Sequence, residues 1–117
     1  RQLQALIEVN ITGDPSKHGV SPDNLFALVK KITAAQPTGI AVRGLMTIGP
    51  YPADEHQSRT AFAALRALRD ACQSRFGFTD FTELSMGMSS DYIPAILEGA
   101  TMVRVGSAIF GERDYSR

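Results

Sequence analysis

The run "FTELSMGMSSDYIPAILEGATMVRVG", residues 81–106, carries the clearest sign of the fold. It begins with the strand-like "FTEL", 81–84, passes through the loop "SMGMSSD", 85–91, and continues as a short helix that ends at Gly99. A second strand-like segment, "TMVRVG", 101–106, follows directly. Two strands joined through a helix are expected to be parallel, because a parallel pair needs a crossover connection of roughly a dozen residues.

The remainder of the chain repeats this alternation of strands and helices. The other expected elements are a strand over residues 3–11, a helix from the N-cap Ser21 to a point before Pro37, a strand over 39–49, a helix from about Asp54 to Arg75, and a helical turn at "SAIFG", 107–111. Four such units predict an α/β fold with a parallel sheet. Their density is that of half a (β/α)8 barrel, since the whole barrel has roughly 250 residues. A complete open sheet of four strands is the alternative.

Composition excludes several classes of protein. The chain of 117 residues is expected to form one domain or less. Its 12 basic and 12 acidic residues give no reason to expect nucleic acid or an anionic membrane as a partner. The single Cys72 cannot form an internal disulfide, and two histidines beside one cysteine make no metal-ligand cluster. We therefore expect a cytoplasmic, soluble protein without a metal site.

The loops that follow the last two expected strands suggest an anion site. In barrels, phosphate groups often bind between the loops after the last two strands, and these loops are here "SMGMSSD" and "GSAIFG", 106–111. Gly87 and Gly106 let the backbone approach an anion closely. The serine hydroxyls that can donate are those of Ser85, Ser89, Ser90 and Ser107. We call these two loops the phosphate cup. Ordinary helix capping and a plain turn are the alternative interpretation.

Arg104 lies in an otherwise apolar strand. An unpaired buried charge is costly, so its guanidinium needs a partner. The structural alternative is an ion pair with Glu8 or Glu83, and the functional one is contact with an electron-rich atom of a ligand. Lys17 and His18 are interpreted as part of a solvated turn. The sequence offers no catalytic triad and no Walker loop.

Four segments together resemble one protein family. They are "EVNITGDPSKHG", 8–19, "VRGLMTIG", 42–49, "LSMGMSSDY", 84–92, and "GATMVRVGSAIFGERDY", 99–115. The chain is similar over nearly its whole length to the C-terminal half of the pyridoxal phosphate homeostasis proteins, the YggS-like group, which have an alanine racemase N-terminal type of barrel. The resemblance implies a (β/α)8 barrel that binds pyridoxal 5′-phosphate (PLP), without established turnover, in vitamin B6 and amino-acid homeostasis.

The resemblance also implies roles for individual residues. Those expected beside the cofactor phosphate are Ser85, Met86, Gly87, Met88, Ser89, Gly106 and Ser107. The segment "VRVG" is similar to the "VRPG" segment of alanine racemases, so Arg104 is expected to face the pyridine nitrogen. Asn10 and Met46 are expected to line the barrel near the ring. No catalytic residue is implied.

The chain departs from the family in one large respect. The family's Schiff-base lysine lies in the N-terminal half, and Lys17, Lys30 and Lys31 are outside its motif. Residues 1–117 are therefore expected to be part of a PLP-binding barrel domain that holds PLP non-covalently at most. Half a barrel exposes two strand edges, so we expect it to pair with the missing half or with a second copy. A racemase-like PLP enzyme and another phosphate-binding barrel enzyme are the alternative functions.

Overall fold

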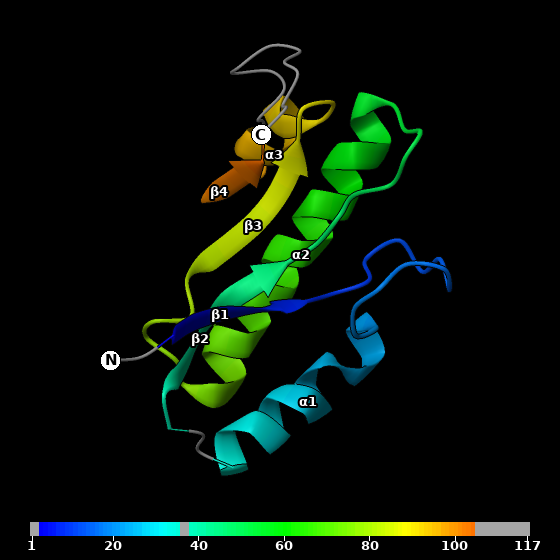
Figure 1. Ribbon diagram of the computed structural model, residues 1–117. Coiled ribbons are helices and arrows are strands. Elements are labelled where there is room, and N and C mark those ends of the chain that lie inside the picture. Colours follow the sequence, from blue (N-terminus) through cyan, green and yellow to red (C-terminus); the bar gives the residue numbers. More distant parts are fainter. Residues whose placement is uncertain (1–2, 36–37, 105–117) are drawn as a thin grey trace, which may run out of the picture.

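The computed structural model describes residues 3–35 and 38–104. Its elements are β1 (Leu3–Glu8), α1 (Pro22–Ala35), β2 (Ile40–Met46), α2 (Glu55–Phe76), β3 (Glu83–Met88), α3 (Tyr92–Leu97) and β4 (Met102–Arg104). The strands form one sheet in the order β1-β2-β3-β4, and each neighbouring pair is parallel (Figure 1). This confirms the predicted α/β fold.

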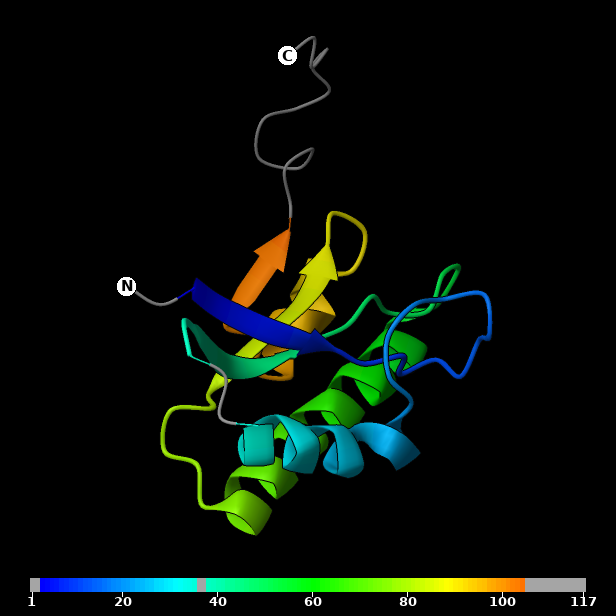
Figure 2. The same ribbon diagram turned by 60° about the horizontal axis from the view of Figure 1, so that its bottom comes forward.

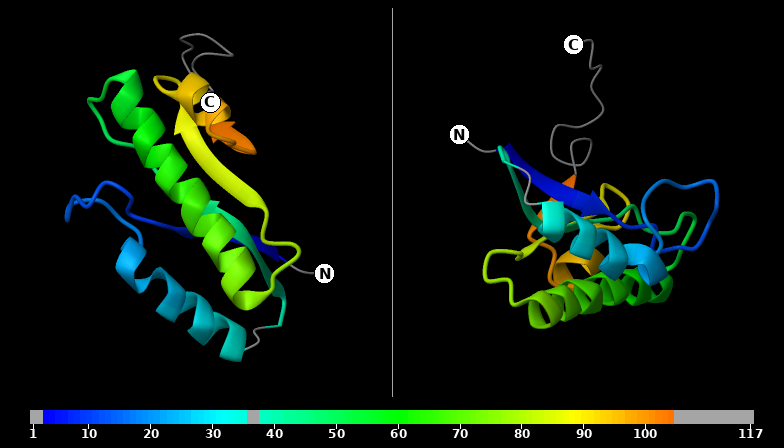
Figure 3. Two further views of the ribbon diagram at one scale, coloured as in Figure 1. Left: turned by 180° about the vertical axis from the view of Figure 1, so that it is seen from behind. Right: turned by 90° about the horizontal axis from the view of Figure 1, so that it is seen from below.

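The described part of the chain has two layers. The helices α1, α2 and α3 lie against one face of the sheet, as Figures 2 and 3 show. No helix within residues 3–35 and 38–104 covers the opposite face. Because the strands are parallel, their carboxyl ends meet at one edge, and the loops after β1, β2 and β3 gather there (Figure 1).

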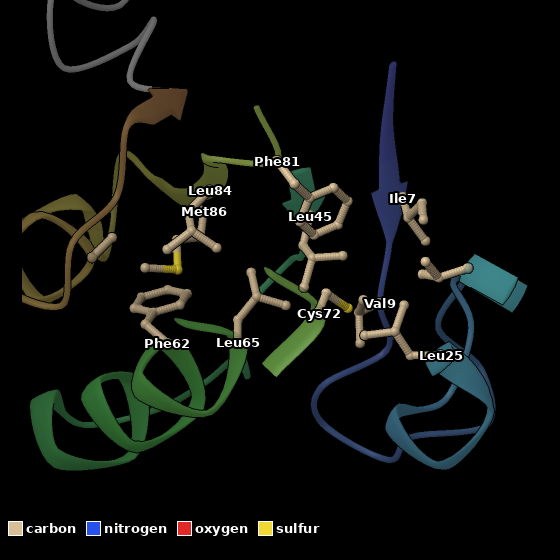
Figure 4. Packing of buried hydrophobic residues seen from close by; sticks show 12 residues of the cluster. Ile7, Val9, Leu25, Leu45, Phe62, Leu65, Cys72, Phe81, Leu84 and Met86 are labelled. Carbon is tan, nitrogen blue, oxygen red and sulfur yellow. The ribbon is translucent and has the colours of Figure 1, made fainter. Parts of the chain in front are cut away.

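The hydrophobic core fills the space between the sheet and the helices. Leu45, Leu84 and Met86 come from the strands and meet Phe62 and Leu65 of α2 (Figure 4). All five side chains are fully buried. Burial of each large apolar side chain contributes about 1.5–3 kcal/mol, so this layer provides much of the stability of the fold.

Cys72 also belongs to this core. Its side chain is fully buried, and burial raises the pKa of the thiol above its ordinary value. Cys72 is thus a packing residue of the core.

The helix boundaries follow the capping residues. At the start of α2, the Asp54 carboxylate accepts a hydrogen bond from the Gln57 amide, and the Gln57 side chain accepts one from the Asp54 amide. At its end Gly77 takes a left-handed conformation, with φ 70°. These residues place α2 within one residue of the prediction at each end.

The prediction for the third strand was wrong. It placed the strand at residues 81–84, whereas β3 continues to Met88, so half of the expected loop is strand. The cause is pairing with both neighbours: Leu45 and Met46 of β2 lie opposite Leu84 and Ser85, and Ser85 lies opposite β4. The expected helical turn at 107–111 and the end of the fourth strand lie outside the described residues.

Both outer strands of the described sheet have an exposed large apolar side chain. Leu3 of β1 is 72% exposed and Met102 of β4 is 41% exposed. The short helix α3 also exposes Ile93, Ile96 and Leu97. In the described residues, no helix is both long enough and apolar enough to cross a membrane.

Candidate functional site

The centre of the candidate site is a contact between β3 and β4. The Nη1 atom of Arg104 donates to the Ser85 hydroxyl at 2.9 Å. Ser85 is buried, with 5% of its surface exposed. The β3–β4 register shifts by one residue between Ser85 and Met88, which places Arg104 opposite Met88.

The second terminal nitrogen of Arg104 is an exception among the buried polar atoms. Nη2 is buried, and it has no hydrogen-bond partner in the described part of the chain. The structural alternative, an ion pair with Glu8 or Glu83, is not found among the described residues, where the acidic partners of the salt bridges are Glu98 and Asp70. Leaving a buried donor unsatisfied costs about 1–3 kcal/mol, and more for a charged group. The orphan nitrogen therefore marks a place for an acceptor from outside these residues.

Met86 and Gly87 are packing positions near the end of β3. The Met86 side chain is fully buried and points toward Phe62 (Figure 4), so only its backbone is available to a ligand. Gly87 has a φ of 104°, and a Cβ there would lie 2.6 Å from the Cβ of Ala95. The glycine is required because α3 packs directly on β3 at this point.

Beyond Gly87 the chain turns at the carboxyl end of β3. Residues 88–91, here the 88–91 turn, have exposed side chains at Met88, Ser89 and Ser90. The turn borders a cavity of about 370 Å³ shared with residues 48–51. The cavity is lined by Ile48, Gly49, Pro50, Tyr51, Met88, Ser89, Ser90 and Asp91. The predicted phosphate serines of this loop thus separate into buried Ser85 and exposed Ser89.

The residues predicted near the ring lie in β2 and in the loop that follows β1. Met46 is half-buried and lies between Glu8 and Ser85 in the sheet register, so it is adjacent to the Arg104–Ser85 contact. Asn10 uses its amide within its own loop. Its Nδ2 donates to the Asp14 carbonyl at 2.8 Å, and its Oδ1 accepts from Gly13 at 3.2 Å. Asn10 thus orders the loop that follows β1.

Lys17, interpreted from the sequence as part of a solvated turn, is half-buried at the carboxyl-terminal edge of the sheet, which we call the mouth of the sheet. Its Nζ donates to the Gly49 carbonyl at 3.3 Å and so joins the loop after β1 to the loop after β2. A cavity of about 230 Å³ lies beside it, lined by Glu8, Val9, Asn10, Ser16, Lys17, His18 and Ile48. Hydrogen bonds from the Ser16 amide and hydroxyl hold the pKa of the Asp14 carboxyl below its ordinary value. The sequence contains no signal for the Lys17–Gly49 contact, which spans 32 positions.

Gly106 and Ser107, the second half of the predicted phosphate cup, lie outside the described residues. The structure therefore brings together Ser85, Arg104 and Met46, and presents Ser89 at the same end of the sheet. Asp91 also lies at this end.

Sequence comparison finds relatives among the pyridoxal phosphate homeostasis proteins. The pyridoxal phosphate homeostasis protein of Homo sapiens is 42% identical over 118 residues, which are 99% of this chain and 42% of the relative. The protein of the same name from Aquifex aeolicus is 47% identical over 110 residues, 94% of this chain and 47% of the relative. The chain thus spans less than half the length of these relatives.

Solved structures of PipY from Synechococcus elongatus PCC7942 share the fold. The structure without PLP has a TM-score of 0.81 and 35% sequence identity, covering 90% of this chain and 48% of that chain. The structure with PLP bound has a TM-score of 0.76 and 31% identity, covering 90% and 47%. Residues 1–114 also match the family described as the alanine racemase N-terminal domain. With this match and the shared parallel α/β architecture, the chain belongs to the alanine racemase N-terminal domain family.

Proposed function

We propose that this chain binds pyridoxal 5′-phosphate, as the C-terminal half of a non-catalytic (β/α)8 barrel that serves vitamin B6 and amino-acid homeostasis. The observation that carries the proposal is the buried Nη2 atom of Arg104, which has no acceptor within residues 3–35 and 38–104. The solved PipY structure with PLP bound, at 31% identity, supports the choice of ligand.

The pyridine nitrogen of PLP is a suitable acceptor for this atom. It has one in-plane lone pair, and a guanidinium N–H donates in the plane of its own fork. PLP supplies an aldehyde and an electron-withdrawing ring. A permanent positive charge on Arg104 disfavours a second one on the ring nitrogen, which lowers the pKa of that nitrogen. An unprotonated ring withdraws electrons more weakly than a protonated one.

The phosphate is assigned to the phosphate cup. The 88–91 turn presents Ser89 beside a cavity, and its serine hydroxyl can donate to phosphate oxygens. Gly106 and Ser107 are proposed to complete the cup from the other side. Ser85 acts behind it, because its hydroxyl accepts from Arg104 and orients the guanidinium.

PLP is held non-covalently in this proposal. Lys17, the lysine that lines a cavity at the loop end of the sheet, donates to the Gly49 carbonyl, whereas Lys30 and Lys31 lie on α1. The Lys17 amine is thus engaged with the loop after β2. This chain spans less than half the length of the relatives, and the Schiff-base lysine is assigned to the other half of the barrel.

We further propose that the exposed edges of β1 and β4 are covered by that missing half, or by a second copy of this chain. Leu3 and Met102 on these two strands are exposed apolar side chains that such a contact would bury. Sedimentation velocity of the chain alone is expected to show a dimer or larger assembly, and a stable folded monomer would refute pairing between copies. A cytoplasmic location belongs to the same proposal.

The function is tested by titrating PLP into the chain and following the PLP absorption spectrum. We expect saturable binding, displaced poorly by simple sugar phosphates, and no adduct in the intact mass after borohydride reduction. Arg104→Ala is expected to lose this binding. Arg43→Ala is its matched control, because Arg43 donates to the carbonyl of Asp80, which precedes β3. Equal competition by sugar phosphates would favour a different phosphate-binding barrel. Conversion of L-alanine to D-alanine by the loaded protein would favour a racemase.

A further inference from the structure

Asp91 occupies the N-cap position of α3 without capping it. Its φ and ψ are −142° and 23°, and its side chain makes no hydrogen bond to the helix start. Asp54, in the corresponding position of α2, forms a full capping box. The carboxylate of Asp91 is therefore used elsewhere.

The carboxylate reaches backward to the end of β3. Its Oδ1 accepts from the Met88 amide at 2.7 Å, and the Asp91 amide donates to the Met88 carbonyl at 3.1 Å. These two bonds join the first and last residues of the 88–91 turn. Ser89 and Ser90 lie between them with exposed side chains, so the carboxylate fixes the backbone of both serines.

The other carboxylate oxygen lies against the loop after β2. A Cβ added to Gly49 would be 3.1 Å from Oδ2 of Asp91 and 3.0 Å from Cζ of Phe62. The glycine leaves room for the carboxylate, and the Gly49 carbonyl in turn accepts from Lys17. Asp91 is thus wedged between two loops at the mouth of the sheet.

We propose that Asp91 is a positioning residue of the phosphate cup: its carboxylate holds the 88–91 turn in the conformation that receives the phosphate of PLP. This inference rests on the proposed function. A carboxylate repels a phosphate dianion, so direct contact between the two is excluded. The stabilisation that the phosphate gains from an ordered Ser89 and Ser90 must exceed this repulsion.

Two substitutions separate the charge of Asp91 from its role as an acceptor. Asp91→Asn keeps an oxygen for the Met88 amide and removes the charge, whereas Asp91→Ala removes both. A hydrogen bond to a charged group contributes about 1.5–3 kcal/mol, so we expect Asp91→Ala to weaken PLP binding about tenfold or more. We expect Asp91→Asn to bind PLP as tightly as the wild type or more tightly.

The readout is the ratio of the PLP and pyridoxal affinities, measured by spectrophotometric titration of the full chain. Pyridoxal lacks the phosphate, so Asp91→Ala should lower this ratio about tenfold and change pyridoxal binding little. Asp14→Ala is the control, because it removes similar side-chain bonds to the Ser16 amide and hydroxyl in another loop.

The possible outcomes distinguish a failure of the inference from a failure of the proposed function. A wild-type preference for PLP that Asp91→Ala abolishes and Asp91→Asn retains supports the positioning role. The same preference unchanged in Asp91→Ala overturns the inference and leaves PLP binding intact. A wild-type chain that binds PLP no better than pyridoxal contradicts the proposed function and the inference together.

Discussion

Gly87 offers a quantitative test of how α3 packs on β3. Replacing it with alanine would place a Cβ 2.6 Å from the Cβ of Ala95 and 3.2 Å from Cγ1 of Val103. The φ of 104° adds backbone strain of about 1–2 kcal/mol for any residue with a Cβ. Overpacking typically costs about 1–3 kcal/mol. We therefore expect Gly87→Ala to lower the free energy of unfolding by about 2–5 kcal/mol.

The assay is urea unfolding. Comparison of two further variants separates the cost of backbone strain from the cost of the close Cβ contact. Gly99→Ala is the matched control for strain, because Gly99 has a φ of 98° and its added Cβ would meet only Cδ of Arg66, at 3.5 Å. The double variant Gly87→Ala with Ala95→Gly removes the contact between the two Cβ atoms. It should be more stable than the sum of the single effects predicts, by about 1–3 kcal/mol.

Two results would refute this reasoning. If Gly87→Ala costs no more than Gly99→Ala, the close approach of α3 to β3 is not present in solution. If the effects of Gly87→Ala and Ala95→Gly simply add, the two positions do not touch.

Two further predictions concern the α2 helix and its contacts. A hydrogen bond from Arg59 and the nearby Arg66 charge hold the pKa of the Glu98 carboxyl below its ordinary value of 4.5. The ion pair therefore stabilises the fold above that pH, and this stabilisation is lost as the pH falls through the lower folded-state pKa. Unfolding measured between pH 6 and pH 3, a range chosen to bracket that value, should show an acid loss of stability that is smaller in Glu98→Gln, and equal slopes would contradict the ion pair. Asp54→Ala should lower the free energy of unfolding by about 1 kcal/mol, because it removes the cap of α2. Asp54→Asn should stay close to wild type when both variants are unfolded in urea, and equal losses would contradict the capping bond to Gln57.

The sequence predicted the helices well because their signals are local. Asp54 and Gly77 mark the ends of α2 through bonds that reach only three or four residues along the chain. Pro22 marks the start of α1 through its fixed φ, which is also a local signal. Such caps can be read from neighbouring residues, so the boundaries need no knowledge of the tertiary structure.

The end of β3 was mislocated because its signal is not local. "SMGM" consists of small and flexible residues that are typical of a turn, yet Ser85 and Met86 are buried by the flanking strands and by Phe62. Tertiary pairing overrides the weak local preference there. The sequence alone therefore divides strand from turn in the wrong place.

The contacts of the candidate site depend on register in the same way. Arg104 donates to Ser85, and the register shift between β3 and β4 places Arg104 opposite Met88; no spacing in the sequence indicates either contact. The backward bond of Asp91 to Met88 competes with ordinary capping, and the same residue types suit both arrangements. Residue types predicted an anion site, and the structure was needed to say how its parts are held.

The central claim is that Arg104 offers its buried Nη2 to the ring nitrogen of PLP, and one comparison tests it most directly. It measures the affinity of wild-type and Arg104→Ala chains for PLP and for an analogue in which C–H replaces the ring nitrogen. The wild type should prefer PLP by about tenfold or more, as expected for a charged hydrogen bond, and Arg104→Ala should bind both ligands equally. A wild type that binds PLP and its analogue with the same affinity, or a preference that survives in Arg104→Ala, would contradict the account.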